Sequence, residues 1–200
     1  PALAETVKLG VLLGFTGPIE SLTPDMAAGA EMAMAEATKS GKFMGGSTIE
    51  SVRGDSTCVD AAAATATAER LITSDKVVAI MGADCSGVTT AVLQNVATAK
   101  GIVMISPSAT SPALSTIEDN GLFFRTSPSD ARQGQVLAEI LKEKGVKSAA
   151  ISYTNNDYGK GLADSIQSNF EAVGGKVTIS ASHEDGKGDY GAEVGALAQA

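Results

Sequence analysis

The sequence contains no tryptophan, one histidine and two cysteines among its 200 residues, and aromatic side chains make up only 4% of it. A transition-metal centre needs several histidine, cysteine or carboxylate ligands at defined spacings, so this inventory argues against a dedicated metal site. The motif G-x-x-x-x-G-K-[ST] is absent as well, which argues against a nucleotide phosphate loop. We therefore expect neither a metal nor a cofactor.

Basic residues are also scarce. The chain has 15 lysines and arginines against 23 acidic residues, a formal net charge of -8 and an isoelectric point near 4.6. Nucleic acids and anionic membrane surfaces attract proteins with clustered basic residues, whereas here they are scattered singly, so we expect neither as a partner. No apolar run approaches the roughly 20 residues of a membrane-spanning helix. Hydrophobic residues still make up 44% of the chain, which is ample for a buried core.

Short apolar segments alternate with helical patterns along the whole chain. The expected strands lie within 7–14, 47–56, 77–82, 101–107, 121–128, the first part of 146–159, and 176–185. The expected helices lie within 24–41, 58–76, 86–100 and 130–145, in the second part of 146–159 and beyond it, and from about 189 onward. Strands that alternate with helices of about 10 to 15 residues predict an α/β fold, with parallel sheets covered by helices on both faces.

Ligands of such folds bind beyond the carboxyl ends of the strands. This rule selects four loops rich in small polar residues, at 14–25, 82–87, 106–111 and 154–161. The segment "RTSPSD" has the proline and serine content of a connection between domains. We therefore predict a tail or signal-peptide remnant at 1–6, a first lobe at 7–126 and the first part of a second lobe at 127–200. A second lobe of this size is small, so we expect this chain to be a shortened version of something longer.

The segment "ADCSG" places Asp84, Cys85 and Ser86 between a predicted strand and a predicted helix. The amide groups of a helix N-terminus, together with the Ser86 hydroxyl, would form a seat for a carboxylate or a phosphate. The loop "SPSATSP", with Ser108 and Thr110, offers a second seat of the same kind. The plainer interpretation is that these hydroxyls only cap helices. Two such loops after neighbouring strands favour a shared anion site.

Cys85 also allows an enzymatic interpretation, because small-x-Cys-x-Gly between a strand and a helix approximates a nucleophile elbow. The only histidine, His183, lies far along the chain in "SASHEDGKG", where we expect a solvated surface residue rather than a catalytic base. Cys58 and Cys85 are 27 positions apart and form an even pair. They are either a disulfide of an exported protein or two unrelated thiols of a cytosolic one.

The first residues bear on that choice. In "PALAET", Ala2 and Ala4 are small residues at the two positions that a signal peptidase reads, with the polar Glu5 after them. The alternative is an ordinary N-terminal tail. If the motif is a cleavage scar, the protein is exported to an oxidising compartment.

Taken in order, several segments resemble the periplasmic leucine/isoleucine/valine-binding family, the type I solute receptors of ABC importers. They are "VKLGVLLGFTGP", the Cys58 to Cys85 spacing, "DCSGVTT", "MISPSATSPAL", "FFRTSPSDARQG" and "NNDYGKGLADS". The resemblance covers nearly the whole chain. It implies a type I periplasmic-binding-protein fold, in which two doubly wound parallel-sheet lobes are joined by a hinge and the solute is held between them. It also implies that the second lobe is incomplete here, since the family is longer.

The resemblance further assigns roles to individual residues. Ser86 and its surrounding backbone, including Cys85, would bind the solute carboxylate together with the Thr110 backbone, and the Ser108 carbonyl and Thr110 hydroxyl would hold an α-ammonium group. Further predicted contacts are Ala109, beside Thr110, and Tyr158, and the family's disulfide would join Cys58 to Cys85. Leu22 and Asp84 depart from the family pattern, because Leu22 falls where an aromatic wall is common and Asp84 where an apolar side chain is common. Asp84 would either hold a second cation on the solute or cap its own helix, and the acidic partner of the ammonium group would lie beyond residue 200.

We therefore expect a periplasmic, monomeric solute-binding protein and not an enzyme. It would bind an amino acid or a similar small carboxylate and deliver it to an ABC permease in the inner membrane. Two alternatives stay open at this point: a cysteine hydrolase with Cys85 as its nucleophile, and a ligand-sensing domain of a receptor or regulator with the same fold.

Overall fold

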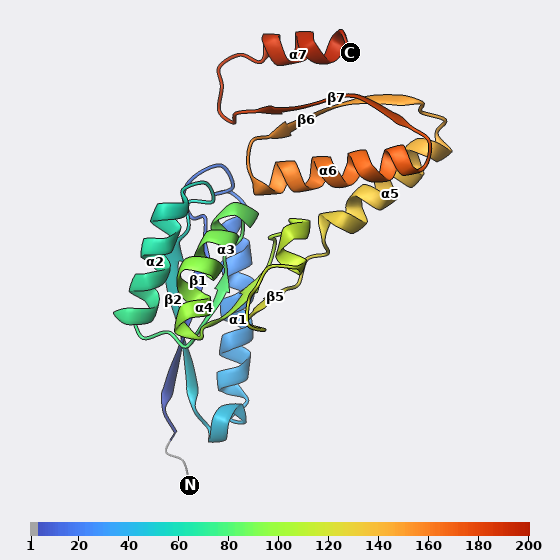
Figure 1. Cartoon of the computed structure of the whole chain (residues 1–200). Coiled ribbons are helices and arrows are strands. Elements are labelled where there is room, and N and C mark those ends of the chain that lie inside the picture. Colours follow the sequence, from blue (N-terminus) through green and yellow to red (C-terminus); the bar gives the residue numbers. More distant parts are fainter. Residues whose placement is uncertain (1–3) are drawn as a thin grey trace. The chain divides into compact units, whose positions relative to one another are not determined.

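The computed structural model describes residues 4–200 and divides them into two compact units (Figure 1). Unit 1 contains the chain up to Ala109 together with Glu118–Ser127, and unit 2 contains Thr110–Ile117 together with Pro128–Ala200. The predicted first lobe, 7–126, thus includes the short segment Thr110–Ile117 that makes its contacts within unit 2. Ala2 and Leu3 of the predicted tail lie outside the described residues, and the first strand already begins at Thr6.

Strands and helices alternate as the sequence pattern predicts. The strands are β1 (Thr6–Leu13), β2 (Thr48–Asp55), β3 (Ala79–Gly82), β4 (Val103–Ser106), β5 (Phe123–Arg125), β6 (Ser148–Thr154) and β7 (Lys176–His183). The α-helices are α1 (Thr23–Lys39), α2 (Ala61–Thr73), α3 (Ser86–Val92), α4 (Thr98–Lys100), α5 (Asp130–Glu143), α6 (Asp157–Ala172) and α7 (Gly191–Ala198). Short 3-10 helices lie at η1 (Phe43–Gly45) and η3 (Pro112–Ser115). The helix predicted at 86–100 consists of α3, the π-helix η2 (Leu93–Ala97) and α4.

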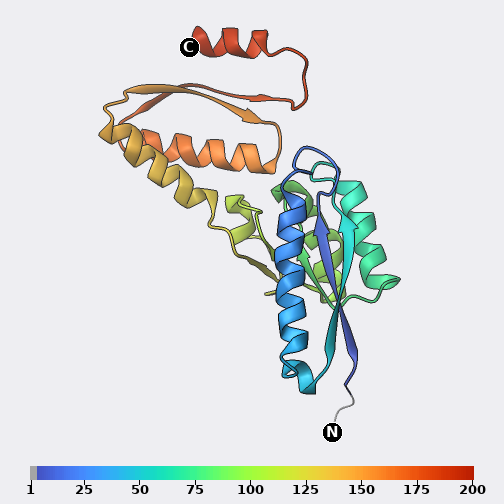
Figure 2. The ribbon, with the colours of Figure 1, turned by 180° about the vertical axis from the view of Figure 1, so that it is seen from behind.

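Unit 1 is built on a parallel sheet with the strand order β2-β1-β3-β4-β5. Successive side chains of a strand point to opposite faces, and β1 shows this clearly. Val11 and Leu13 pack with Ala27 of α1, whereas Gly10, on the other face, lies against Leu71 of α2. Figures 1 and 2 show α1 and α2 on opposite faces of the sheet. Since both faces of β1 are covered, its last three residues, Val11 to Leu13, are fully buried.

Unit 2 contains the parallel pair β6 and β7 and the helices α5, α6 and α7. Helices α5 and α6 approach closely at Gly134, where a Cβ would collide with the backbone of Ser165. Phe170, near the end of α6, is 1% exposed and is among the largest fully buried side chains of the described residues. Its ring packs on the backbone of Gly175, just before β7. No helix among residues 4–200 has the length and apolar character needed to cross a membrane.

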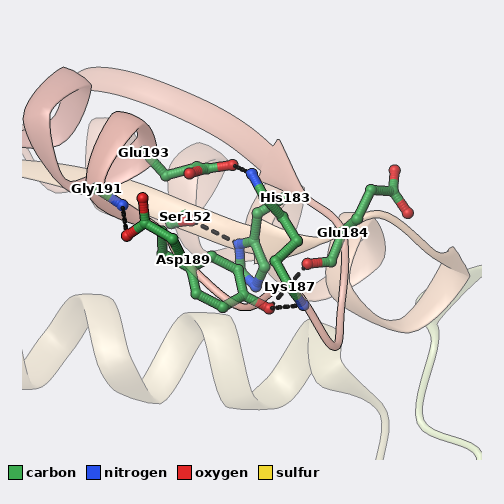
Figure 3. A network of polar contacts seen from close by, with 8 residues as sticks. Ser152, His183, Glu184, Lys187, Asp189, Gly191 and Glu193 are labelled. Atoms are coloured by element: carbon green, nitrogen blue, oxygen red, sulfur yellow. Dashed lines mark hydrogen bonds and ion pairs between the residues drawn. The ribbon is translucent and has the colours of Figure 1, made fainter.

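His183, which was expected to be a solvated surface residue, makes two side-chain contacts in the loop between β7 and α7 (Figure 3). The His183 side chain is half-buried: its Nδ1 lies 2.7 Å from Ser152 Oγ, and its ring meets the Tyr190 ring edge-on with centroids 5.6 Å apart. Lys187 pairs with Glu193 across the same loop, and this contact holds the pKa of Glu193 below its usual value. His183 therefore helps to order the connection to α7.

Candidate functional site

The carboxyl ends of β1, β3 and β4 meet at one edge of the unit 1 sheet, because these three strands are adjacent and parallel. The loops that follow them begin at Gly14, Ala83 and Pro107, as the predicted ligand loops require. We call the segment Ala83–Ser86 the β3 turn. It leads directly into α3, whose first residue is Ser86 and whose N-cap is Cys85. Gly82 precedes it with a φ of 138°, and a Cβ there would collide with the Leu12 carbonyl oxygen.

Hydrogen bonds join the β3 turn to the loop after β4. Ser106 Oγ donates to the Ala83 carbonyl, and Ser108 Oγ donates to the Asp84 carbonyl at 3.0 Å. Ser106 Oγ also accepts the Ala109 amide at 2.9 Å. The structure thus brings Cys85 and Ser86 together with Ser108 at one edge of unit 1.

Asp84 lies in this turn, but neither of its two predicted roles fits the structure. Its side chain is 1% exposed, so its carboxylate is enclosed by protein and does not face a solute cation. The prediction that Asp84 caps its own helix is wrong, since the N-cap position is Cys85 and the cap has no side-chain hydrogen bond. The carboxylate instead accepts hydrogen bonds from Gly14, Ser56 and Cys85.

Cys85 is bonded to Cys58 in a disulfide, as the resemblance implied. The chain has two cysteines, so neither is a free thiol. A disulfide sulfur cannot act as the thiolate nucleophile that a cysteine hydrolase requires. The hydrolase alternative therefore fails on the state of Cys85 in this structure. Among residues 4–200, no group of three or more histidine, cysteine or carboxylate side chains is arranged to hold a metal ion.

Leu22 and Ala109 also belong to unit 1. Leu22 is the N-cap of α1, and its side chain is 55% exposed. Ala109 is fully buried, and its carbonyl accepts hydrogen bonds from Arg125 Nη1 at 3.2 Å and from Ser127 Oγ at 3.3 Å. The amide and the carbonyl of Ala109 thus form hydrogen bonds within unit 1, whereas the Leu22 side chain is open to solvent.

Thr110 and Tyr158 belong to unit 2. The Thr110 carbonyl accepts the amide of Asp130, the first residue of α5, at 2.9 Å. Tyr158 is the second residue of α6, and its side chain is 45% exposed. Asn156 caps this helix by accepting the Gly159 amide at 2.8 Å. This cap fixes the first turn of α6 at the carboxyl end of β6, within the ligand loop predicted at 154–161.

The side chain of Asp55, the last residue of β2, forms a second hydrogen-bond network at this edge of the sheet. Asp55 accepts hydrogen bonds from Thr16 Oγ1 at 2.6 Å, from the Thr16 amide at 3.3 Å and from the Thr57 amide at 2.8 Å. Burial raises the pKa of Asp55, but these hydrogen bonds, with that from the Phe15 amide, outweigh it and hold the pKa below its ordinary value. Asp55 therefore ties the loop after β1 to the loop after β2 in its ionised form.

The lowered pKa of Asp55 predicts that its hydrogen bonds stabilise the fold in an acid-sensitive way. A lowered pKa in the folded state means that the contribution is present above the unfolded-state value of about 3.9 and is lost as the pH falls through the folded-state pKa. We expect Asp55→Asn to reduce the free energy of unfolding at pH 7 by about 1 kcal/mol. The difference in the free energy of unfolding between Asp55→Asn and the wild type, measured by urea denaturation, should shrink toward pH 3. A gap that stays constant from pH 7 to pH 3 would contradict the role of the charge.

Sequence reasoning missed the residues that hold the site in place. Ser56 and Ser106 are fully buried polar residues, and their hydroxyls bond to the Asp84 side chain and to the Ala83 carbonyl. A polar residue at the last position of an apolar strand, as Ser106 is, was the available signal. No local signal pointed to the hydrogen bonds that Asp84 makes with Gly14 and Ser56, because these residues meet only when the strands pair.

Comparison with known proteins identifies the family to which the chain belongs. The model of the periplasmic binding protein family matches residues 6–200. The leucine-, isoleucine-, valine-, threonine- and alanine-binding protein of Pseudomonas aeruginosa is 31% identical over 198 residues, which are 98% of this chain and 52% of that protein. The chain thus spans about half the length of the curated relatives it matches.

Solved structures agree on the fold. A branched-chain amino acid transporter substrate-binding protein of Streptococcus pneumoniae in complex with isoleucine superposes with a TM-score of 0.82 at 28% identity, over 98% of this chain and 54% of that one. A solute-binding protein of an R. palustris ABC transporter in complex with 4-hydroxybenzoate superposes with a TM-score of 0.83 at 25% identity, over 97% of this chain and 51% of that one. These are binding proteins, and none is named as an enzyme. The chain belongs to the periplasmic binding protein family, with the type I α/β fold and an incomplete second lobe.

Proposed function

We propose that this chain is the solute-recognising part of a periplasmic solute-binding protein that serves an ABC importer. The observation that carries the proposal is the β3 turn, where Cys85 is the N-cap and Ser86 the first residue of α3, beside Ser108 at the carboxyl edge of the sheet. Family membership supports the same conclusion. Export to the periplasm and delivery to an inner-membrane permease are parts of the proposal that rest on the family alone.

The solute we propose is a small carboxylate, either an amino acid or an aromatic acid. Relatives of both kinds are known, since one solved structure holds isoleucine and another holds 4-hydroxybenzoate. The two ligands share a carboxylate and differ in the ammonium group. A seat of helix N-terminal amides and hydroxyls suits the shared group, because amide dipoles at a helix N-terminus favour negative charge.

In the proposed binding mode, the solute carboxylate contacts Ser86 and the amides around it. Burying this charge without hydrogen bonds would cost several kcal/mol, so each carboxylate oxygen needs donors. For an amino acid, the Ser108 carbonyl and the Thr110 hydroxyl are the proposed partners of the ammonium group. Leu22 and Tyr158 are the proposed apolar and aromatic contacts, and the family resemblance is the support for these assignments.

The test is thermal unfolding of the natural protein that carries this chain, measured against a panel of amino acids and aromatic acids. A solute that binds only the native state stabilises it by about 2.7 kcal/mol at a hundredfold excess over its dissociation constant. We expect one solute class to raise the melting temperature and Ser86→Ala to abolish the rise. Ser74→Ala, an exposed serine just after α2, is the matched control and should keep the rise.

The outcomes separate the alternatives. A shift with aliphatic amino acids but not with benzoates would assign the amino acid class, and the reverse would assign the aromatic acids. A panel without any shift would remove the proposed function, provided that circular dichroism shows the protein to be folded. A shift that Ser86→Ala leaves intact would place the carboxylate elsewhere.

A further inference from the structure

The enclosed carboxylate of Asp84 connects three loops of unit 1. Its Oδ2 accepts the Gly14 amide at 2.5 Å, while its Oδ1 accepts the Ser56 hydroxyl at 2.8 Å and the Cys85 amide at 3.0 Å. Gly14 follows β1, Ser56 follows β2 and Cys85 follows β3. One side chain therefore bonds to the segments that leave three adjacent strands, at the edge where the proposed seat lies.

The surroundings of Asp84 leave little room for another arrangement. Ser56 is 0% exposed, and its Oγ also accepts the Cys58 amide at 3.3 Å. A Cβ on Gly14 would lie 3.2 Å from Asp84 Oδ2 and equally close to Cys58. A buried carboxylate without hydrogen-bond donors is costly, so the three donors and the carboxylate hold one another in a single arrangement.

We infer that Asp84 is a positioning residue for solute binding, and this inference rests on the proposed function. Asp84 does not touch the solute, because its side chain is enclosed. It holds the Cys85 amide and the backbone of the β3 turn at a set place relative to the loops after β1 and β2. The disulfide ties the same turn to Cys58 independently. Asp84 thereby determines how the first amides of α3 and the Ser86 hydroxyl are presented to a carboxylate.

The hydrogen-bond pattern makes Asp84→Asn an informative variant. An asparagine has nearly the shape of the aspartate but replaces one acceptor oxygen with an NH2 group, which only donates. Because both carboxylate oxygens accept hydrogen bonds here, either orientation of the amide sets a donor against a donor. The variant therefore breaks at least one of the three hydrogen bonds without leaving a cavity. Ser56→Ala removes one of the three donors to Asp84, together with the acceptor of the Cys58 amide, and leaves the carboxylate in place, so it serves if Asp84→Asn does not fold.

The matched control is Ser47→Ala. Ser47 is 2% exposed and lies just before β2, at the opposite end of the sheet. Its hydroxyl accepts the Glu5 amide at 3.2 Å and donates to the Met44 carbonyl at 3.0 Å. The control thus removes buried hydrogen bonds of unit 1 away from the candidate site.

Two quantities should be measured on the natural protein that carries this chain. The first is amide hydrogen exchange of Gly14, Cys85 and Ser86 without solute, and the second is the dissociation constant of the solute found in the panel above. For Asp84→Asn we expect exchange at these amides to speed up and the dissociation constant to rise about tenfold, which corresponds to about 1.4 kcal/mol. Ser56→Ala should shift both quantities in the same direction but less. Ser47→Ala should lower the melting temperature while leaving both quantities unchanged.

Three results would overturn the inference. One is unchanged exchange at Gly14 and Cys85 in Asp84→Asn, which would show that the carboxylate does not hold the loops. Another is faster exchange with an unchanged dissociation constant, which would make Asp84 a structural residue only. The last is a rise in the dissociation constant of equal size in Ser47→Ala, which would trace the effect to general stability. If the wild-type protein binds no carboxylate, the proposed function itself fails, and faster exchange then describes a stabilising network without a role in binding.

Discussion

Replacing both cysteines with alanine is expected to lower the free energy of unfolding by about 3.5 kcal/mol. The disulfide closes a loop of 27 residues between Cys58 and Cys85. In the chain-entropy model, the stabilisation grows with the logarithm of the loop length, because the crosslink restricts the unfolded ensemble. Urea denaturation of the natural protein that carries this chain, with and without a reductant, measures the difference.

The reductant supplies the control for this experiment. It should destabilise the wild-type protein to about the level of the double variant and should leave the double variant unchanged. A thiol assay on the unfolded, unreduced wild-type protein should find no free thiol. Free thiols in that assay, or a denaturation curve that does not respond to the reductant, would contradict the disulfide and reopen the cysteine hydrolase.

Phe170→Ala is expected to lower the free energy of unfolding by about 3 to 5 kcal/mol, the range for removing a buried aromatic ring from a packed core. Phe170 is 1% exposed, and its ring packs on Gly175. The alanine would leave a cavity beneath the connection between α6 and β7. Equilibrium unfolding in urea is the measurement, with the transition of unit 2 followed by hydrogen exchange in α6.

Glu171→Ala is the control for Phe170→Ala, because Glu171 is the next residue of the same helix and is exposed. A surface substitution of this kind should stay within about 0.5 kcal/mol of the wild type. Similar losses in the two variants would show that the helix is sensitive in general and that the ring contributes little by packing.

The order of elements was predictable because it depends on local patterns. The run from Val7 to Gly14 and the alanine-rich segment from Pro24 to Gly41 predicted the first strand and helix, and they form β1 and α1 within a few residues. The ends were less predictable. The helix expected to begin near Cys58 starts at Ala61, because Asp60 caps it by accepting the amides of Ala62 and Ala63 at 2.9 and 3.0 Å.

The roles of single polar residues were predicted less well. Asp84 was expected to face a solute or to cap its helix, but its carboxylate is buried among Gly14, Ser56 and Cys85. For His183 the sequence predicted only a surface position, and its contacts with Ser152 and Tyr190 were not foreseen. In each case at least one partner is distant along the chain: Gly14 and Ser56 lie 70 and 28 positions from Asp84, and Ser152 lies 31 positions from His183. A sequence pattern carries no information about such contacts until strand order and register are known.

The sequence by itself determined the α/β class, the alternation of strands and helices, the family resemblance and the loops where polar side chains gather. These depend on periodicity and composition, which act over a few residues. Only the tertiary structure decided that Cys85 is held in a disulfide and that Asp84 ties three loops together. It also decided that Thr110–Ile117 makes its contacts within unit 2. These features depend on burial and on parallel pairing, which place distant residues side by side and exclude water from the groups between them.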